Sequence, residues 1–161
     1  MKNKPFDKAL ELSGFNASLH KEKIHPSTID FLNKYGVSTE LIQFFTDYSF
    51  DQSVQIGNIY FDRVNDFEEH NLDEMSINCI ETDLLIIGSG LNGDPIVVDL
   101  KNLQVGFVFH DELWDDEEIV LAREILVDMN CGIEDFYLNA VQIENYPVDA
   151  YQAEEYINQD G

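Results

Sequence analysis

The chain has 161 residues, of which 44% are hydrophobic, so it is long and apolar enough for one domain with a buried core. Its 32 acidic residues outnumber nine basic ones, and the net charge of −23 argues against nucleic acid and anionic lipid as partners. No apolar run approaches the ~20 residues that a membrane-spanning helix needs, so no membrane segment is expected.

The N-terminus carries lysines but lacks the continuous apolar stretch of a secretory signal, which predicts a cytoplasmic protein. The two cysteines, Cys79 and Cys131, fit that compartment as reduced and mostly buried thiols. Because neither belongs to a Cys-x-x-Cys pair, the sequence predicts no zinc site and no redox cofactor.

The charge is unevenly distributed along the chain. Residues 1–35 hold six lysines against four acids, whereas residues 36–161 hold 28 acids against Arg63, Lys101 and Arg123. An acidic field attracts cationic partners and raises their encounter rate, which predicts a basic protein partner. Solubility alone is the alternative explanation for such a composition.

The first 24 residues form a weakly amphipathic segment. Phe6, Leu10 and Ala9 fit one helical face that ends near Gly14. The sequence favours either a flexible arm or an extension here, followed by a single domain over residues 25–161.

Two helices are expected next. Ser27 or Thr28 is predicted to cap a short helix that ends at Gly36, and Ser38 or Thr39 to cap a second one. The second helix is expected to be the main helix packed against the sheet. Its predicted core face consists of Leu41, Ile42, Phe44, Phe45 and Tyr48.

From Val54 the hydrophobic period changes to two, which predicts a strand over residues 54–61, followed by a short polar helix or turn at 66–72. Further strands are predicted at 83–88, 94–100 and 104–110. The links between these last strands are too short for a parallel crossover, so their order is predicted to be antiparallel.

Residues 119–129 fit either a helix or a strand, and a strand over 124–129 is preferred because the residues that follow it form a natural break. A clear amphipathic helix follows, and residues 149–157 form a final short helix or a tail. The face of the amphipathic helix consists of Ile133, Phe136, Tyr137, Ala140 and Val141. The expected fold is α+β: N-terminal helices, a central antiparallel sheet of about five strands, and a C-terminal helix packed on the same core.

The stretch Gly88-x-Gly90-x-x-Gly93 matches a dinucleotide-binding pattern on paper. That pattern requires a helix after the third glycine, but Pro95 and the β-branched residues 96–98 favour a strand. We therefore interpret this stretch as a structural turn. Its residues are Gly88, Gly90, Asn92, Gly93 and Pro95.

The central block also carries a family resemblance. An apolar strand ending in Ile87-Gly88-Ser89-Gly90 is followed by Asn92–Asp99, by Val105–Val108 and by His110-Asp111-Glu112-Leu113-Trp114. This block resembles the SUKH superfamily, the Smi/Knr-type family of cell-wall regulators and bacterial immunity proteins, over roughly residues 25–142. The resemblance implies an α+β domain that binds other proteins and, in bacteria, typically neutralises a toxin made beside it.

Trp114 is the best candidate for an interface anchor, because Trp supplies a large contact area and the neighbouring acids supply steering. Burial of Trp114 under the C-terminal helix is the alternative. Asp94, in the turn, is expected to shape the edge that faces the partner. The predicted partner-binding residues are Asp94, Asp111, Glu112, Trp114, Asp115, Asp116, Glu117 and Glu118.

The resemblance and the charge together predict a non-enzymatic immunity-type protein whose acidic face occupies the basic cleft of a nuclease toxin. A regulatory adaptor of cell-wall synthesis or signalling is the second hypothesis. The third is a metal-dependent nuclease that uses Asp83, Asp99 and Lys101, but its acidic surface would repel the substrate. His110, Asp111 and Glu112 are not expected to converge as a catalytic or metal cluster, so no catalytic or metal-binding residue is predicted.

Overall fold

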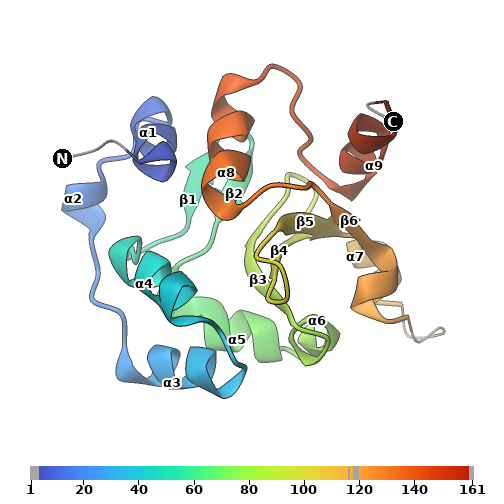
Figure 1. Ribbon diagram of the computed structural model, residues 1–161, viewed down its shortest axis with the longest axis horizontal. Coiled ribbons are helices and arrows are strands. Elements are labelled where there is room, and N and C mark those ends of the chain that lie inside the picture. The colour runs from blue at the N-terminus through green and yellow to red at the C-terminus, as the bar shows by residue number, and fades with distance from the viewer. Residues whose placement is uncertain (1–3, 116, 118–119, 160–161) are drawn as a thin grey trace.

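The computed structural model describes residues 4–115, 117 and 120–159. It has an α+β fold with a six-stranded antiparallel sheet in the order β1-β2-β3-β4-β5-β6 (Figure 1). The strands are β1 (Val54–Ile56), β2 (Ile59–Phe61), β3 (Leu84–Ser89), β4 (Pro95–Asp99), β5 (Val105–Val108) and β6 (Leu126–Asp128). The fold class is as predicted, with six strands where the sequence indicated about five.

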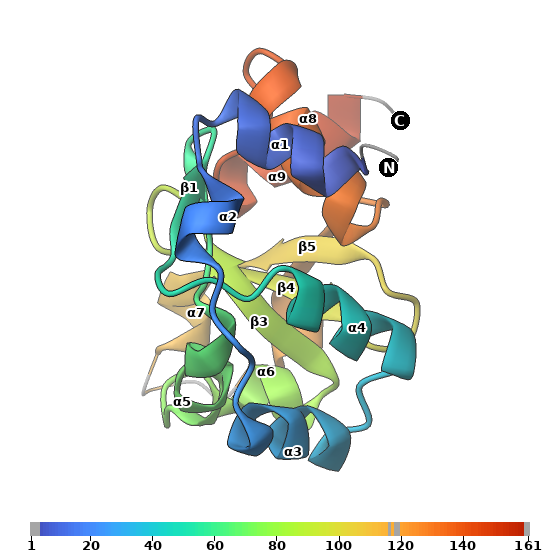
Figure 2. The same cartoon turned by 90° about the vertical axis from the view of Figure 1, so that its left-hand side faces the viewer.

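Helices lie on both sides of this sheet: α1, α8 and α9 on one side, and α3, α5 and α6 on the other (Figure 2). The helices are α1 (Pro5–Leu12), α2 (Ala17–His20), α3 (Pro26–Lys34), α4 (Thr39–Asp47), α5 (Phe67–Leu72), α6 (Ile77–Glu81), α7 (His110–Leu113), α8 (Ile133–Gln142) and α9 (Ala150–Gln159). Two short 3-10 turns, Val64–Asp66 and Ala122–Ile125, complete the described elements.

The sixth strand arises because residues 54–61 form a hairpin and not one strand. Gly57 has a φ of 65° and a Cβ there would lie 2.5 Å from the carbonyl oxygen of Ala140, so glycine is required at this turn. The chain reverses at Gly57-Asn58, and Ile56 and Ile59 then pair across the turn with both side chains buried. The alternating pattern was correct for each arm but did not reveal the reversal between them.

Residues 5–12 are part of the core and not a flexible arm. Phe6, Ala9 and Leu10 lie on one helical face, as their spacing predicted; this face is buried, and α1 packs against α8 (Figure 2). The ring of Phe6 lies 5.1 Å from that of Phe61 and 5.7 Å from that of Tyr137, in edge-to-face arrangements. The N-terminal segment is therefore joined to the core of the domain that follows it.

The two helices after this segment differ in part from expectation. Helix α3 begins at Pro26 with His25 at its N-cap, whereas Thr28 lies within the first turn and donates a hydrogen bond to Asn65 Oδ1. Ser38 caps α4 as predicted, because its side chain accepts a hydrogen bond from the Leu41 amide.

Helix α4 is not the main helix on the sheet. Its Phe45 packs on Phe67 of α5 and its Phe44 on Phe6 of α1, so it packs on neighbouring helices. The elements packed against strands include α5 and α6 on β3, α8 on β1, and α9 on β5 and β6.

The strand and helix predictions for the second half of the chain are largely confirmed. Strands β3, β4 and β5 form the predicted antiparallel hairpins. Residues 126–128 pair with β5 as a short strand, while the residues before them form a 3-10 turn, so the preferred strand is present but shorter. In α8, Ile133, Phe136 and Tyr137 are buried, and α9 is a helix with a buried Ala150 and Ala153.

One buried polar side chain, Asn71 at the end of α5, was not identified from the sequence. Its amide donates to the carbonyl of Ile86 at 3.1 Å, and its Oδ1 accepts from the Ile86 amide at 2.7 Å. Strand β2 pairs with β3 only at Gly88 and Ser89, so it does not reach Ile86. Asn71 therefore supplies the hydrogen bonds to the Ile86 backbone that a longer neighbouring strand would supply.

Replacing Asn71 with alanine is expected to lower the free energy of unfolding by about 2–3 kcal/mol, because it leaves the buried Ile86 amide and carbonyl without partners. Urea unfolding followed by circular dichroism would measure the change. The matched control is Asn33→Ala at an exposed position of α3, expected to change stability by less than about 0.5 kcal/mol. Equal effects of the two substitutions would contradict the role assigned to Asn71.

Candidate functional site

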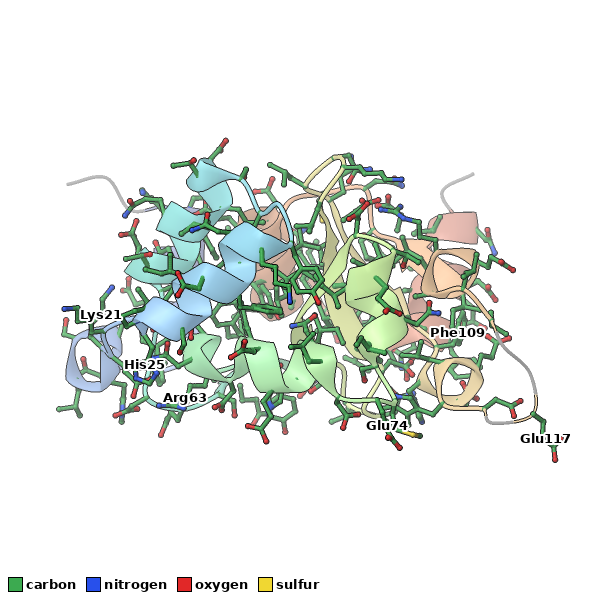
Figure 3. The ribbon with its side chains drawn as sticks, turned by 90° about the horizontal axis from the view of Figure 1, so that it is seen from below. Lys21, His25, Arg63, Glu74, Phe109 and Glu117 are labelled. Carbon is green, nitrogen blue, oxygen red and sulfur yellow. The ribbon has the colours of Figure 1, made fainter. Side chains whose placement is uncertain are left out.

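Charged side chains lie at both ends of the long axis of the molecule. Lys21, His25 and Arg63 lie at one end, and Glu74 and Glu117 lie at the other (Figure 3). Cationic character at the first end is partly neutralised, because Arg63 pairs with Glu22 at 2.8 Å and with Asp66 at 2.9 Å. Arg63 at this end is therefore accompanied by acidic side chains.

Trp114 follows the short helix α7 and is 38% exposed. Its ring centroid lies 4.9 Å from that of His110, which limits where the indole can turn. The space beside the C-terminal helix α9 is taken by Phe109, whose ring contacts Tyr151 at 4.8 Å. The sequence left open whether Trp114 is exposed or buried under the C-terminal helix, and in the structure its side chain is partly exposed.

Trp114 forms one wall of a cavity of about 320 Å³. The segments that meet there are distant in sequence: the residue after β2, helix α5 and the turn after it, the β3–β4 hairpin, and α7. The lining residues are Asp62, Glu69, His70, Asp73, Ser76, Ile86, Gly88, Ser89, Gly93, Pro95 and Trp114. Three carboxylates and one aromatic ring therefore face the same space.

His70 is the one basic side chain of that lining, and it pairs with Asp62 through Nδ1 at 3.0 Å. The hydrogen bond with Asp62 raises the pKa of His70, and the negative charges of Asp62, Asp66 and Glu69 act in the same direction. Among the described residues, no group of three His, Cys, Asp or Glu side chains is arranged to hold a metal ion. The cavity is chemically suited to a cationic group.

Asp94 does not lie on an exposed edge, so it cannot contact a partner directly. Its side chain is fully buried, and its Oδ1 accepts a hydrogen bond from the His110 amide at 3.0 Å and contacts the His110 ring. Its Oδ2 accepts from the amide of Ala150 at 2.8 Å. Asp94 therefore joins the β3–β4 turn to the start of α7 and the start of α9.

The other predicted partner-binding residues lie on α7 or directly after it in the chain. Asp111, Glu112, Asp115 and Glu117 are exposed near Trp114, while Asp116 and Glu118 lie outside the described residues. Asp111 accepts a hydrogen bond from the hydroxyl of Tyr151, and this bond is the main reason why the pKa of Tyr151 rises to about 12.

Most of the predicted turn residues do form the β3–β4 turn. Gly93 has a φ of 95° and donates to the Gly90 carbonyl at 3.1 Å, while Asn92 Oδ1 accepts from the Asp94 amide. Pro95 begins β4, so the absence of a helix after Gly93 is confirmed.

Gly88 corrects the turn prediction, because it lies inside β3 at a bulge. A Cβ at Gly88 would lie 2.0 Å from the Tyr60 carbonyl oxygen. Its role is close packing of β3 against β2, not reversal of the chain.

The residues of the nuclease hypothesis do not form an open site. Both oxygens of Asp99 accept from Arg123, Nη1 at 2.9 Å and Nη2 at 2.6 Å, and Oδ1 also accepts from the Lys101 amide. The hydrogen bonds from Arg123 are the main reason why the pKa of Asp99 is lowered. Asp99 is thus the partner of a structural ion pair at the end of β4.

Sequence reasoning missed the acids and the histidine that face Trp114. The segment 62–74 is rich in acids, which is a signal of charge, but the sequence predicted only a short polar helix or turn over residues 66–72. Its distance of some forty residues from Trp114 in the chain hid the fact that both line one cavity.

No helix in the described part of the chain is long and apolar enough to cross a membrane. In comparisons with known proteins, no protein-family model, curated protein or solved structure matches this chain.

Proposed function

We propose that this protein is a cytoplasmic, non-enzymatic binding domain whose acidic end binds a basic protein, namely a cognate toxin with a cationic nucleic-acid-binding cleft. The observation that carries the proposal is the position of Trp114, an exposed aromatic side chain beside a cavity lined by three carboxylates. Interfaces of this kind use a large aromatic anchor surrounded by charges that orient the partner.

The charge supports a basic partner on physical grounds. A net charge of −23 creates a field that accelerates the approach of a cationic protein and repels nucleic acid. The exposed acids Asp111, Glu112 and Asp115, which flank Trp114 in the chain, would orient the approach toward this surface. A nuclease must itself be basic where it binds its substrate, so the acidic end of this domain complements such a cleft.

The choice of a toxin as partner rests on the resemblance of the central block to SUKH immunity proteins. Co-expression tests it directly: the product of the neighbouring gene, expressed alone, is expected to stop growth, and expression together with this chain is expected to restore it. A harmless neighbour, or a toxic one that this chain neither binds nor inhibits, would rule out the proposed role.

Replacing Trp114 with alanine is expected to weaken binding of the partner about 30-fold, or about 2 kcal/mol, because an interface anchor of this size is removed. Isothermal titration calorimetry would measure the affinity. Leu19→Ala is the control, since Leu19 is 72% exposed on α2 and does not line the cavity. A partner that binds the Trp114→Ala variant as tightly as the unchanged protein does not use this surface.

Association with the partner is expected to slow by about tenfold or more between 0.05 and 0.5 M salt, because screening shortens the range of the acidic field. Dissociation should change less, since short-range contacts dominate it. Stopped-flow measurements at several salt concentrations give both rates. An association rate that is independent of salt would mean that charge does not steer the encounter.

A further inference from the structure

We propose that the cavity beside Trp114 binds one arginine side chain of the partner. This inference rests on the proposed function and specifies the group that the surface recognises. It combines three features of the lining: acidic residues, an exposed indole, and apolar and glycine residues.

The ionisable groups of the lining favour a cation. Asp62, Glu69 and Asp73 contribute three carboxylates, and the lining contains neither lysine nor arginine. Asp62 is engaged with His70, and one oxygen of Asp73 accepts from the Met75 amide at 3.1 Å. Glu69 forms no ion pair with another described residue, so Glu69 and the second oxygen of Asp73 can accept hydrogen bonds from a ligand.

The aromatic wall distinguishes this cavity from a simple group of surface acids. Among the described Phe, Tyr and Trp residues, Trp114 and Tyr151 are the exposed ones, and Tyr151 does not line the cavity. Trp provides the most favourable face for a cation, and the contact between Trp114 and His110 restrains the indole ring. An exposed indole and nearby carboxylates together are the complement of a guanidinium group.

The remaining lining suits the aliphatic part of an arginine side chain. Ile86, Gly88 and Pro95 belong to the lining and contribute apolar atoms to it. A volume of about 320 Å³ lies at the lower end of the range for ligand pockets, roughly 300–1,000 Å³, and fits one side chain better than a large cofactor.

Arginine fits this arrangement better than lysine. Its planar guanidinium stacks on an aromatic face while its N–H groups donate in the same plane to carboxylates, whereas an ammonium group is a compact and strongly hydrated charge. In this cavity tryptophan and acidic residues line the same space, and a guanidinium group can stack on an indole while it donates to a carboxylate.

The test uses the intrinsic fluorescence of Trp114, which is the only tryptophan in the chain. The full-length protein is titrated with the capped tripeptide acetyl-Gly-Arg-Gly-amide. Parallel titrations use the same peptide with lysine and with citrulline, the uncharged isostere of arginine. We expect a saturable change in Trp114 fluorescence with the arginine peptide, a weaker change with the lysine peptide and no change with the citrulline peptide.

A matched pair of double variants locates the response. Glu69→Gln with Asp73→Asn is expected to weaken arginine binding by about tenfold, because two carboxylates of the cavity lose their charge. Glu154→Gln with Glu155→Gln removes the same net charge from exposed positions of α9 outside the cavity, and its affinity is expected to stay within about twofold.

Equal responses to arginine and citrulline, or equal loss in the two double variants, would overturn the arginine site. The same holds if arginine produces no fluorescence change. The basic partner protein, titrated in parallel, separates this failure from that of the proposed function. If the partner still binds with dependence on Trp114, only the arginine site is wrong, whereas loss of both signals would reject the proposed function too.

Discussion

Replacing Asp94 with alanine is expected to lower the free energy of unfolding by about 3–5 kcal/mol, the largest effect among the substitutions considered. The buried carboxylate accepts hydrogen bonds from the amides of His110 and Ala150 and contacts the His110 ring. Alanine would leave both amides without their acceptor and would separate the β3–β4 turn from α7 and α9. Urea unfolding at neutral pH measures the loss.

The control for this prediction is Asp30→Ala, which removes a carboxylate from an exposed position of α3. Its effect is expected to stay within about 0.5 kcal/mol. Asp94→Asn should lie between the two, because an asparagine keeps one oxygen acceptor in nearly the same volume. A stable Asp94→Ala variant would mean that the contacts of Asp94 do not hold α7 and α9 in place.

Replacing Arg123 with alanine is expected to cost about 3 kcal/mol at neutral pH, because it leaves the carboxylate of Asp99 unpaired while that residue is only 6% exposed. The Thr82 carbonyl also loses its hydrogen bond from Arg123 Nε. Lys101→Ala is the matched control, since it removes one positive charge from an exposed side chain. Its expected effect is below about 0.5 kcal/mol.

The cost of Arg123→Ala should depend on pH in a defined direction. In the folded protein the pKa of Asp99 is lowered from its ordinary value of 3.8, so the stabilisation from its ionised form is present above that value. It is lost as the pH falls through the lowered pKa. The difference in unfolding free energy between the unchanged protein and Arg123→Ala should therefore be largest near pH 7 and shrink below pH 4.

Urea unfolding of both proteins at a series of pH values measures this difference. Most other charges titrate equally in the two proteins, so the difference reports mainly on the Asp99–Arg123 pair. A difference that stays constant from pH 7 to pH 2.5 would show that the ion pair does not cause the lowered pKa of Asp99.

The parts of the fold that sequence reasoning predicted correctly are those in which local patterns decide. The apolar runs of β3 and β4, the short link from β4 to β5, and the stripe of Ile133, Phe136 and Tyr137 in α8 each carry their information within about ten residues. Short links also determined that the central strands are antiparallel.

The predictions that failed depend on contacts between segments that are far apart in sequence. The alternation over residues 54–61 is compatible with one strand or with two, and only the approach of Gly57 to Ala140 on α8 shows why the chain turns there. Similarly, the face of α1 was visible in the sequence, but its burial depends on Phe61 and Tyr137, which supply the surface against which Phe6 packs.

The residues of the candidate site also fall into two groups: those that the sequence identified, and those whose place depends on tertiary packing. Trp114 and the exposed acids beside it were identified from the sequence, because charge and residue type are visible without coordinates. The SUKH resemblance and the tendency of loops to carry function predicted that Asp94 shapes the partner surface, whereas its burial depends on α7 and α9 folding over it. Asp62, Glu69 and Asp73 were not linked to Trp114 at all.

The sequence by itself determined the acidic character, the α+β class and the main strands, since these depend on composition and on short-range periodicity. Only the tertiary structure decided that Asp94 is buried and that Asp73 and Trp114 line one cavity. The physical reason is that burial and proximity depend on how separate elements pack together. That packing is a property of the whole chain, and no local pattern of residues specifies it.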